Sequence, residues 1–168
     1  LTSGHRCGQR PGYPGFTVVS GCTHACPECF NPSLGLPVWS AFGPEQMDQI
    51  LTALGKSYVR GLSLLGGEPF HPNNQKTVLE LVKRVRQQYP QKDIWCYTGY
   101  LFEDLAAGKV GDYGRALLEQ LDVLVDGPFV IAENLSLRFR GSSNQRILEV
   151  QPSLERGEPV LWDEASVE

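Results

Sequence analysis

The sequence has little that would direct the chain to a membrane or to nucleic acid. Its 168 residues contain no apolar run that approaches the roughly 18 residues needed to cross a bilayer. The net charge is −4 and no basic block stands out, so we expect neither nucleic acid nor a membrane surface as a partner. Residues 1–6 lack the apolar stretch of a signal peptide, and Leu1 stands where a methionine is expected, which leaves the true start of the chain open.

The chain also lacks internal repeats, low-complexity blocks and a linker that would divide it. With 41% hydrophobic and 20% charged residues, the composition is that of one ordinary domain with a real core. We therefore expect a single domain over residues 1–150. The segment after Glu149 is polar, and we expect residues 151–168 to form a poorly ordered polar tail.

Cysteine is scarce and unevenly placed. The five cysteines are an odd number, and Cys22, Cys26 and Cys29 lie within eight residues of one another. A secreted disulfide framework would favour an even number spread over the chain. The clustering instead indicates metal binding in the reducing cytoplasm, where free thiolates and an oxygen-sensitive centre survive.

The spacing of the clustered cysteines, CxxxCxxC, indicates a particular kind of metal centre. A [4Fe–4S] cluster is normally held by four cysteines. Three thiolates on one short loop would hold three irons and leave the fourth without a protein ligand, so that a small molecule can bind there. An open position of this kind distinguishes catalytic metal sites from closed structural ones. The sequence therefore predicts a catalytic [4Fe–4S] cluster bound by Cys22, Cys26 and Cys29.

Short apolar runs alternate with amphipathic helical stretches along the rest of the chain. This alternation predicts an α/β fold with a mostly parallel sheet. We expect strands at residues 16–19, 61–65, 93–98 and 122–126, and helices at residues 44–56, 73–89, 101–107 and 113–121. Ligands bind beyond the carboxyl ends of parallel strands. The four segments expected to meet there are the cysteine loop, Gly66-Gly67-Glu68-Pro69, Thr98-Gly99-Tyr100 and Asp126-Gly127-Pro128.

The cysteine spacing, followed by Gly66-Gly67-Glu68-Pro69 after the second strand, resembles the radical S-adenosylmethionine superfamily. Further segments, in the same order and at similar spacing, narrow the resemblance to the anaerobic ribonucleoside-triphosphate reductase-activating proteins. They are residues 19–22, 62–69, 93–95, 97–100, 122–129 and 138–146. The sequences VDGPF and RGSSNQR are the ones typical of this subfamily. The match extends from Val18 to about Arg146, decays before Phe16, and implies a partial (β/α) barrel of the TIM type.

The resemblance implies S-adenosyl-L-methionine as a second cofactor. Its methionine end would chelate the iron that the three cysteines leave open. The adenine would contact the backbone of the cysteine loop. The amino group of the methionine end would lie near a glycine pair and would donate a charge-assisted hydrogen bond to a carboxylate. The residues implied are Glu28, Cys29 and Phe30 toward the adenine, and Gly66, Gly67 and Glu68 toward the amino end.

Several other polar residues have two interpretations each. Thr98 and Asp126 stand at strand ends and either contact the cofactor or stabilise the turns. Arg138, Arg140 and Arg146 either form a solvated strand face or dock a partner protein.

The remaining candidates for a metal centre are interpreted as structural. His24 is expected to be a solvent-facing loop residue, and Cys96 a small core residue in an apolar strand. The role of Cys7 stays open. One of these three residues would complete the site if the cysteine loop held a structural zinc ion instead of a cluster.

The implied function is an oxidoreductase that activates the anaerobic ribonucleotide reductase. It would cleave S-adenosylmethionine reductively at the cluster and generate a glycyl radical on the reductase. The implied partners are the glycyl-radical subunit and an electron donor such as flavodoxin or ferredoxin, in the cytoplasm. One alternative is another radical enzyme, which activates pyruvate formate-lyase or acts on a small molecule. An alternative of a different class is a non-catalytic iron–sulfur or zinc binding module.

Overall fold

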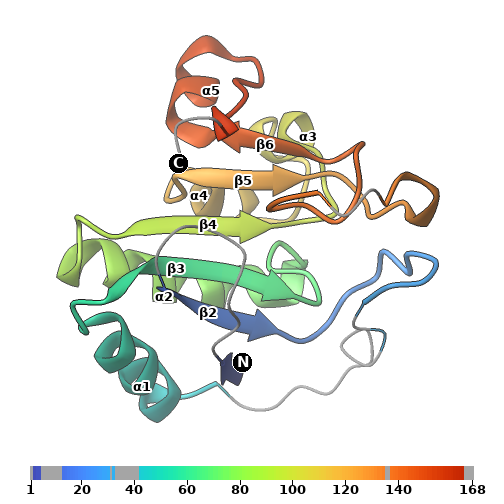
Figure 1. The fold of residues 1–168 in the computed structure, drawn as a ribbon. Helices are drawn as coiled ribbons and strands as arrows, with labels where there is room; N and C mark the ends of the chain where they lie inside the picture. The colour runs from blue at the N-terminus through green and yellow to red at the C-terminus, as the bar shows by residue number, and fades with distance from the viewer. Residues whose placement is uncertain (1, 5–12, 31, 33–41, 135–136, 165–168) are drawn as a thin grey trace.

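The computed structural model describes residues 2–4, 13–30, 32, 42–134 and 137–164, which form an α/β fold around one six-stranded sheet (Figure 1). Four strands are parallel, namely β2 (Tyr13–Val19), β3 (Val59–Gly66), β4 (Asp93–Tyr97) and β5 (Val123–Asp126). β1 (Thr2–Gly4) and β6 (Arg146–Glu149) pair antiparallel at the two edges. The predicted α/β class with a mostly parallel sheet is confirmed. The sheet is open among the described residues, since β1 and β6 are its edges.

The longer helices lie where the apolar periodicity predicts them. The connections between the parallel strands contain α1 (Pro44–Leu54), α2 (Pro72–Gln88), α3 (Phe102–Ala106) and α4 (Gly114–Leu118). α2 buries Val78, Val82 and Val85, which lie along one side of the helix. Figure 1 shows α2 and α4 on the same face of the sheet. Among the residues that the structure describes, no helix is both long and apolar enough to cross a membrane.

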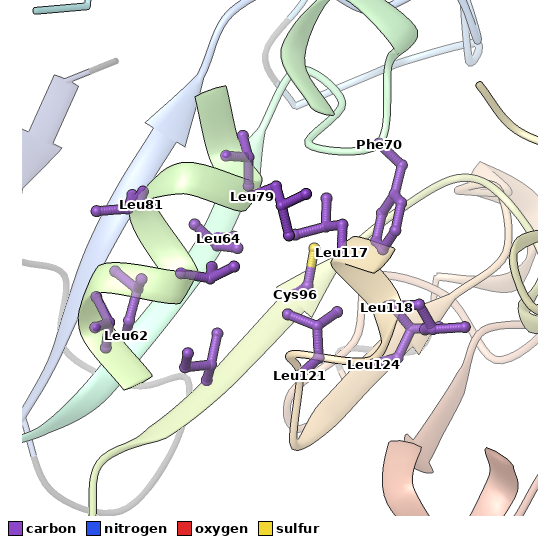
Figure 2. Packing of buried hydrophobic residues seen from close by; sticks show 14 of the residues in the cluster. Leu62, Leu64, Phe70, Leu79, Leu81, Cys96, Leu117, Leu118, Leu121 and Leu124 are labelled. Atoms are coloured by element: carbon purple, nitrogen blue, oxygen red, sulfur yellow. The ribbon is translucent and has the colours of Figure 1, made fainter. Parts of the chain in front are cut away.

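The main core lies between these helices and the sheet. Alternate strand residues point to this face, among them Leu62, Leu64 and Cys96, and each is at most 1% exposed. Figure 2 shows Cys96 among leucines of the same cluster. Burial raises the pKa of the Cys96 thiol well above its ordinary value, so this group stays neutral. The interpretation of Cys96 as a small core residue is confirmed.

The opposite face of the sheet carries a smaller aromatic cluster. The ring of Trp95 on β4 lies 5.9 Å from that of Phe139 and 5.0 Å from that of Trp162. The Phe139 and Trp162 rings are 5.6 Å apart and perpendicular, a favourable arrangement for aromatic pairs. This cluster packs the chain after β5 and the segment after residue 156 against the sheet.

The segment after Glu149 forms regular structure, so the prediction of a poorly ordered tail is wrong for residues 151–162. α5 (Val150–Arg156) follows β6 directly, Leu161 pairs with β6, and Trp162 donates a backbone hydrogen bond to it at 2.8 Å. Pro152 fits the first turn, where backbone N–H groups have no partner within a helix. Gly157, with φ 71°, ends the helix in the left-handed conformation that glycine favours. Seven residues are too few for an apolar period to be visible in the sequence.

Candidate metal centre and cofactor site

The segments that follow the four parallel strands meet at one end of the sheet, as predicted. In Figure 1 the arrowheads of β2, β3, β4 and β5 point toward this end. The backbone N–H of Glu68 donates to the Gly21 carbonyl at 2.9 Å and joins the first two segments. The Thr98 hydroxyl donates to the Glu68 carboxylate at 2.7 Å and joins the third. The Gly127 N–H donates to the Tyr100 carbonyl at 3.0 Å and joins the fourth.

Residues 21–30, the cysteine loop, leave the end of β2 with a strained backbone. Ala25 has φ 47° and Glu28 has φ 55°, in the left-handed region that costs a residue with a Cβ roughly 1–2 kcal/mol. Each of them directly precedes a cysteine, Cys26 or Cys29. Strain that persists in a native loop points to a functional constraint at that place. The strain here lies where the direction of two thiols is set.

The donor set of this loop fits an iron–sulfur cluster. Cys22 and Cys26 are half-buried, Cys29 is exposed, and none of them is in a disulfide. In a cluster each thiolate binds a different iron, so the three sulfurs need not converge on one point. A single zinc ion needs converging donors. No group of three His, Cys, Asp or Glu side chains converges in that way within the described part of the chain, and Cys7 lies outside it.

Burial raises the pKa of the Cys22 thiol above its ordinary value of 9.0. A hydrogen bond from the His24 backbone opposes this effect, and the negative charge of Glu68 adds to it. In the cluster-free protein Cys22 is therefore a thiol at neutral pH. Because metal ligation requires the thiolate, iron binding at Cys22 would release a proton.

We expect the alkylation rate of Cys22 in the iron-free protein to be still rising at about pH 9, since the rate follows the thiolate fraction. The measurement is anaerobic reaction with iodoacetamide between about pH 7 and pH 10.5, followed by peptide mass spectrometry. Glutathione in the same tube is the unperturbed thiol, and its rate should level off earlier. A plateau for Cys22 at or below that of glutathione would contradict the burial effect.

The Glu68 carboxylate is 1% exposed and accepts four hydrogen bonds. Oε1 accepts from the Phe70 N–H at 2.9 Å and from the Thr98 hydroxyl at 2.7 Å. Oε2 accepts from His24 Nε2 at 2.7 Å and from the Gly99 N–H at 2.8 Å. A carboxylate offers about four lone-pair directions, and protein donors occupy them. The structure thus favours a positioning role for Glu68 over the direct contact with a ligand ammonium that the family resemblance implies. We call Glu68 and its three donors other than His24 the Glu68 network.

Thr98 and Asp126 stabilise the ends of their strands. Thr98 is 5% exposed and donates to Glu68. Asp126 is 0% exposed and accepts from the Phe102 N–H at 2.8 Å and from Arg146 Nε at 3.0 Å. Of the two interpretations open for each residue, the structure favours stabilisation of the turns, since both side chains already have buried protein partners.

The three arginines after β5 differ in their surroundings. Arg146 binds Asp126 and also Glu103, the latter through two hydrogen bonds of 2.9 and 2.8 Å. These acidic partners raise the pKa of Arg146, and Arg146 lowers the pKa of Glu103. Arg140 donates to a carbonyl of its own loop at 3.0 Å. Of the three, Arg138 is the exposed one, so the docking interpretation suits Arg138 best.

The loop that contains Gly66 and Gly67 is fixed on both sides. Gly66 has φ 118°, a conformation open to glycine and rarely to other residues. Phe70 is 0% exposed and holds the end of the loop in the core (Figure 2). Asn74, in the first turn of α2, donates to the carbonyls of Ser20 and Glu68, both at 2.9 Å. Sequence reasoning missed Asn74, because nothing in the local pattern marks its side chain as buried.

The expected adenine side of the cysteine loop is exposed. Glu28 and Cys29 are accessible, and the side chain of Phe30 is 68% exposed. The ring of Phe30 lies 4.8 Å from that of Phe129, which follows β5. The rings of Phe30 and Phe129 together offer an apolar surface on which a planar group can stack.

The interpretation of His24 as a solvent-facing residue is wrong. Its side chain is 19% exposed, and it bonds to a carboxylate that lies 44 positions later in the chain. The sequence has no signal for this contact, because the loop conformation decides which of its residues faces Glu68.

The open α/β sheet, with three cysteines on the loop after a parallel strand, suits an iron–sulfur protein with a single cluster. The model of a family described as "4Fe-4S single cluster domain" matches residues 3–148. The match includes the cysteine loop and every parallel strand of the sheet. No solved structure gives a significant match to the chain.

Curated relatives narrow this class. The chain is 43% identical to the anaerobic ribonucleoside-triphosphate reductase-activating protein of Vibrio cholerae, over 82% of this chain and 88% of the relative. The protein of the same name from Escherichia coli K12 is 41% identical, over 80% and 87% of the two chains. That of Enterobacteria phage T4 is 36% identical, over 82% and 84%. The chain therefore belongs to the family of anaerobic ribonucleoside-triphosphate reductase-activating proteins.

Proposed function

We propose that this chain activates an anaerobic ribonucleoside-triphosphate reductase as a radical S-adenosylmethionine enzyme. The observation that carries the proposal is the membership in a family of activating proteins together with three cysteines on one strained loop at the carboxyl end of a parallel sheet. With its cofactors bound, the site would pass one electron from an external donor to S-adenosylmethionine, and a glycine of the reductase would lose a hydrogen atom to the 5′-deoxyadenosine that is released.

We infer that Cys22, Cys26 and Cys29 hold the cluster through their thiolates. Their donor chemistry and their separate positions on the loop support a cluster with one iron free for a small ligand. Cys22 and Cys26 are half-buried, so this part of the loop is partly shielded by protein. The exposed Cys29 lies on the side from which S-adenosylmethionine would enter.

The remaining part of the site would bind S-adenosylmethionine. Gly66 and Gly67 leave backbone groups accessible to the amino end, and the φ of Gly66 supports this role. The exposed backbone around Glu28 and the ring of Phe30 would meet the adenine. Glu68 acts through the groups that it orients, because its acceptor directions are filled by protein donors.

The fold supports a protein as the substrate. We infer that residues 1–150 form a radical S-adenosylmethionine domain in which the open sheet is a partial (β/α) barrel. A partial barrel leaves one side accessible, and a glycine-bearing loop of the reductase needs such an entrance. The expected electron donor is a flavodoxin or ferredoxin, and the expected location is the cytoplasm.

The test is anaerobic reconstitution followed by reduction in the presence of S-adenosylmethionine. We expect 5′-deoxyadenosine by chromatography, and a glycyl radical by electron paramagnetic resonance when the reductase is added but not when pyruvate formate-lyase is added. A radical on pyruvate formate-lyase instead would select the other type of activase. A full cluster without 5′-deoxyadenosine would indicate a binding module, and a colourless protein with one zinc ion would indicate a scaffold.

A further inference from the structure

His24 lies between two of the three cysteines, and its imidazole reaches away from the loop toward the sheet. Its Nε2 lies 2.7 Å from Glu68 Oε2, so the ring donates a hydrogen bond through this nitrogen. Its ring centroid lies 4.5 Å from that of Tyr100 in an edge-on contact. The side chain is 19% exposed, so most of it is withdrawn from solvent.

Gly99 provides the space for this ring. A Cβ at Gly99 would lie 2.7 Å from His24 Cδ2 and 2.8 Å from its Nε2, closer than real side chains approach. The φ of Gly99 is not in the left-handed region, so a backbone conformation is not the reason for a glycine here. The reason for a glycine here is the close approach of the His24 imidazole.

The acceptor of the His24 hydrogen bond is itself held by other protein groups. Three further donors hold the Glu68 carboxylate: the Phe70 N–H, the Thr98 hydroxyl and the Gly99 N–H. Two of them are backbone groups in the segments that follow β3 and β4, and Glu68 is buried. A donor that binds such an acceptor is fixed to the sheet and not to another mobile side chain.

Other contacts hold the beginning of the cysteine loop. Asn74 donates to the Ser20 carbonyl, and the Glu68 N–H donates to the Gly21 carbonyl. These contacts end before Cys22. His24 acts further along, between Cys22 and Cys26, and a side-chain hydrogen bond between Thr23 and Tyr100 lies beside it. The imidazole therefore fixes a part of the loop that the backbone contacts at its start do not reach.

We propose that His24 is a positioning residue for the reaction. It connects the cysteine loop to the Glu68 network and so fixes the cluster relative to Gly66 and Gly67, where the amino end of S-adenosylmethionine would bind. The proposal rests on the proposed function for its consequence, but the connection itself is a property of this chain. Nε2 of His24 is bonded to Glu68, so only Nδ1 is left as a possible metal ligand, and the iron content of the His24 variants tests that alternative.

Three variants test whether His24 positions the cysteine loop or ligates iron. His24→Phe keeps a ring of similar size and removes the donor. His24→Gln keeps an N–H donor at a similar reach and removes the ring, and serves as the conservative rescue. Gly99→Ala leaves His24 unchanged but places a methyl group where the imidazole lies. It provides a second route to the same displacement if His24→Phe folds poorly.

We expect all three variants to bind a full complement of iron and sulfide. In His24→Phe and Gly99→Ala, the affinity for S-adenosylmethionine and the rate of 5′-deoxyadenosine formation should each fall about tenfold, the effect of one hydrogen bond to a charged group. The change that S-adenosylmethionine causes in the electron paramagnetic resonance spectrum of the reduced cluster should be altered as well. His24→Gln should recover affinity and rate to within about twofold of the parent chain.

Hydrogen–deuterium exchange of residues 22–29 in the iron-free protein tests the connection without any cofactor. We expect exchange about tenfold faster in His24→Phe and near the parent rate in His24→Gln. Unchanged exchange, or unchanged affinity and spectrum in His24→Phe, would overturn the proposal. Loss of iron in both His24 variants would make His24 a ligand and overturn it too. If the parent chain itself forms no 5′-deoxyadenosine while exchange changes as expected, the proposed function fails and the connection stands.

Discussion

Cys26→Ala is expected to lose the cluster and all formation of 5′-deoxyadenosine. Two thiolates on this loop would leave two irons of the cluster without protein ligands, and no third cysteine is near enough among the described residues, since Cys96 is buried in the core. Iron and sulfide analysis after anaerobic reconstitution, with the visible spectrum, measures the first effect. Chromatography after reduction with S-adenosylmethionine measures the second, and we expect a fall of at least about a hundredfold.

Cys96→Ala is the matched control for this variant. It removes a cysteine sulfur from the core face of β4, where the thiol is neutral and 0% exposed. We expect a loss of about 1 kcal/mol in the free energy of unfolding, as for a small deletion in a core, and a full cluster. A full cluster in Cys26→Ala would show that the ligand set is wrong. A cluster lost in Cys96→Ala would show that Cys96 takes part in it.

The position of the site could be predicted from the sequence because it follows from strand direction. Parallel strands end at the same edge of a sheet. The alternation of strands and helices therefore predicts that the segments with Cys22, Gly66, Thr98 and Asp126 lie at one edge. The cysteine spacing gave the kind of centre through the chemistry of thiolates. Both inferences need only local sequence and a rule of topology.

The roles of individual polar side chains could not be predicted in the same way. A carboxylate beside a glycine pair suggests a ligand contact, but Glu68 is buried and four protein donors surround it. Two of those donors are backbone N–H groups, which carry no signal in the sequence. The prediction for His24 is wrong for a similar reason, because its partner Glu68 lies 44 positions later in the chain. A buried charge needs partners, and only the packed structure shows which groups provide them.

The sequence pattern also does not predict the elements after β5. β6 has four residues and α5 has seven, so neither carries enough periods for a pattern to be visible. Their positions depend on long-range contacts, such as the pairing of β6 with β5 and the packing of Trp162 on Trp95. Such contacts override weak local preferences.

Arg146→Met is expected to destabilise the protein by about 3 kcal/mol or more, because it leaves the carboxylate of Asp126 buried without its charged partner. In a chain of this size, that corresponds to a fall of roughly 10 °C in the melting temperature. Thermal unfolding of the iron-free protein measures it. The double variant Arg146→Met with Asp126→Asn removes the unpaired charge, keeps an acceptor for the Phe102 N–H, and should recover at least about half of the loss.

Lys109→Met is the control for the loss of a surface ion pair. Lys109 is 69% exposed and its partner Asp104 is 45% exposed, so we expect a change below about 0.5 kcal/mol. Equal effects of Arg146→Met and Lys109→Met would contradict a buried ion pair at Asp126. The same variants decide between the two interpretations of Arg146. If Arg146→Met keeps its stability and 5′-deoxyadenosine formation but activates the reductase poorly, the arginine docks the partner. If activation of the reductase falls only in proportion to the loss of folded protein, Arg146 serves to hold the end of β5 in place.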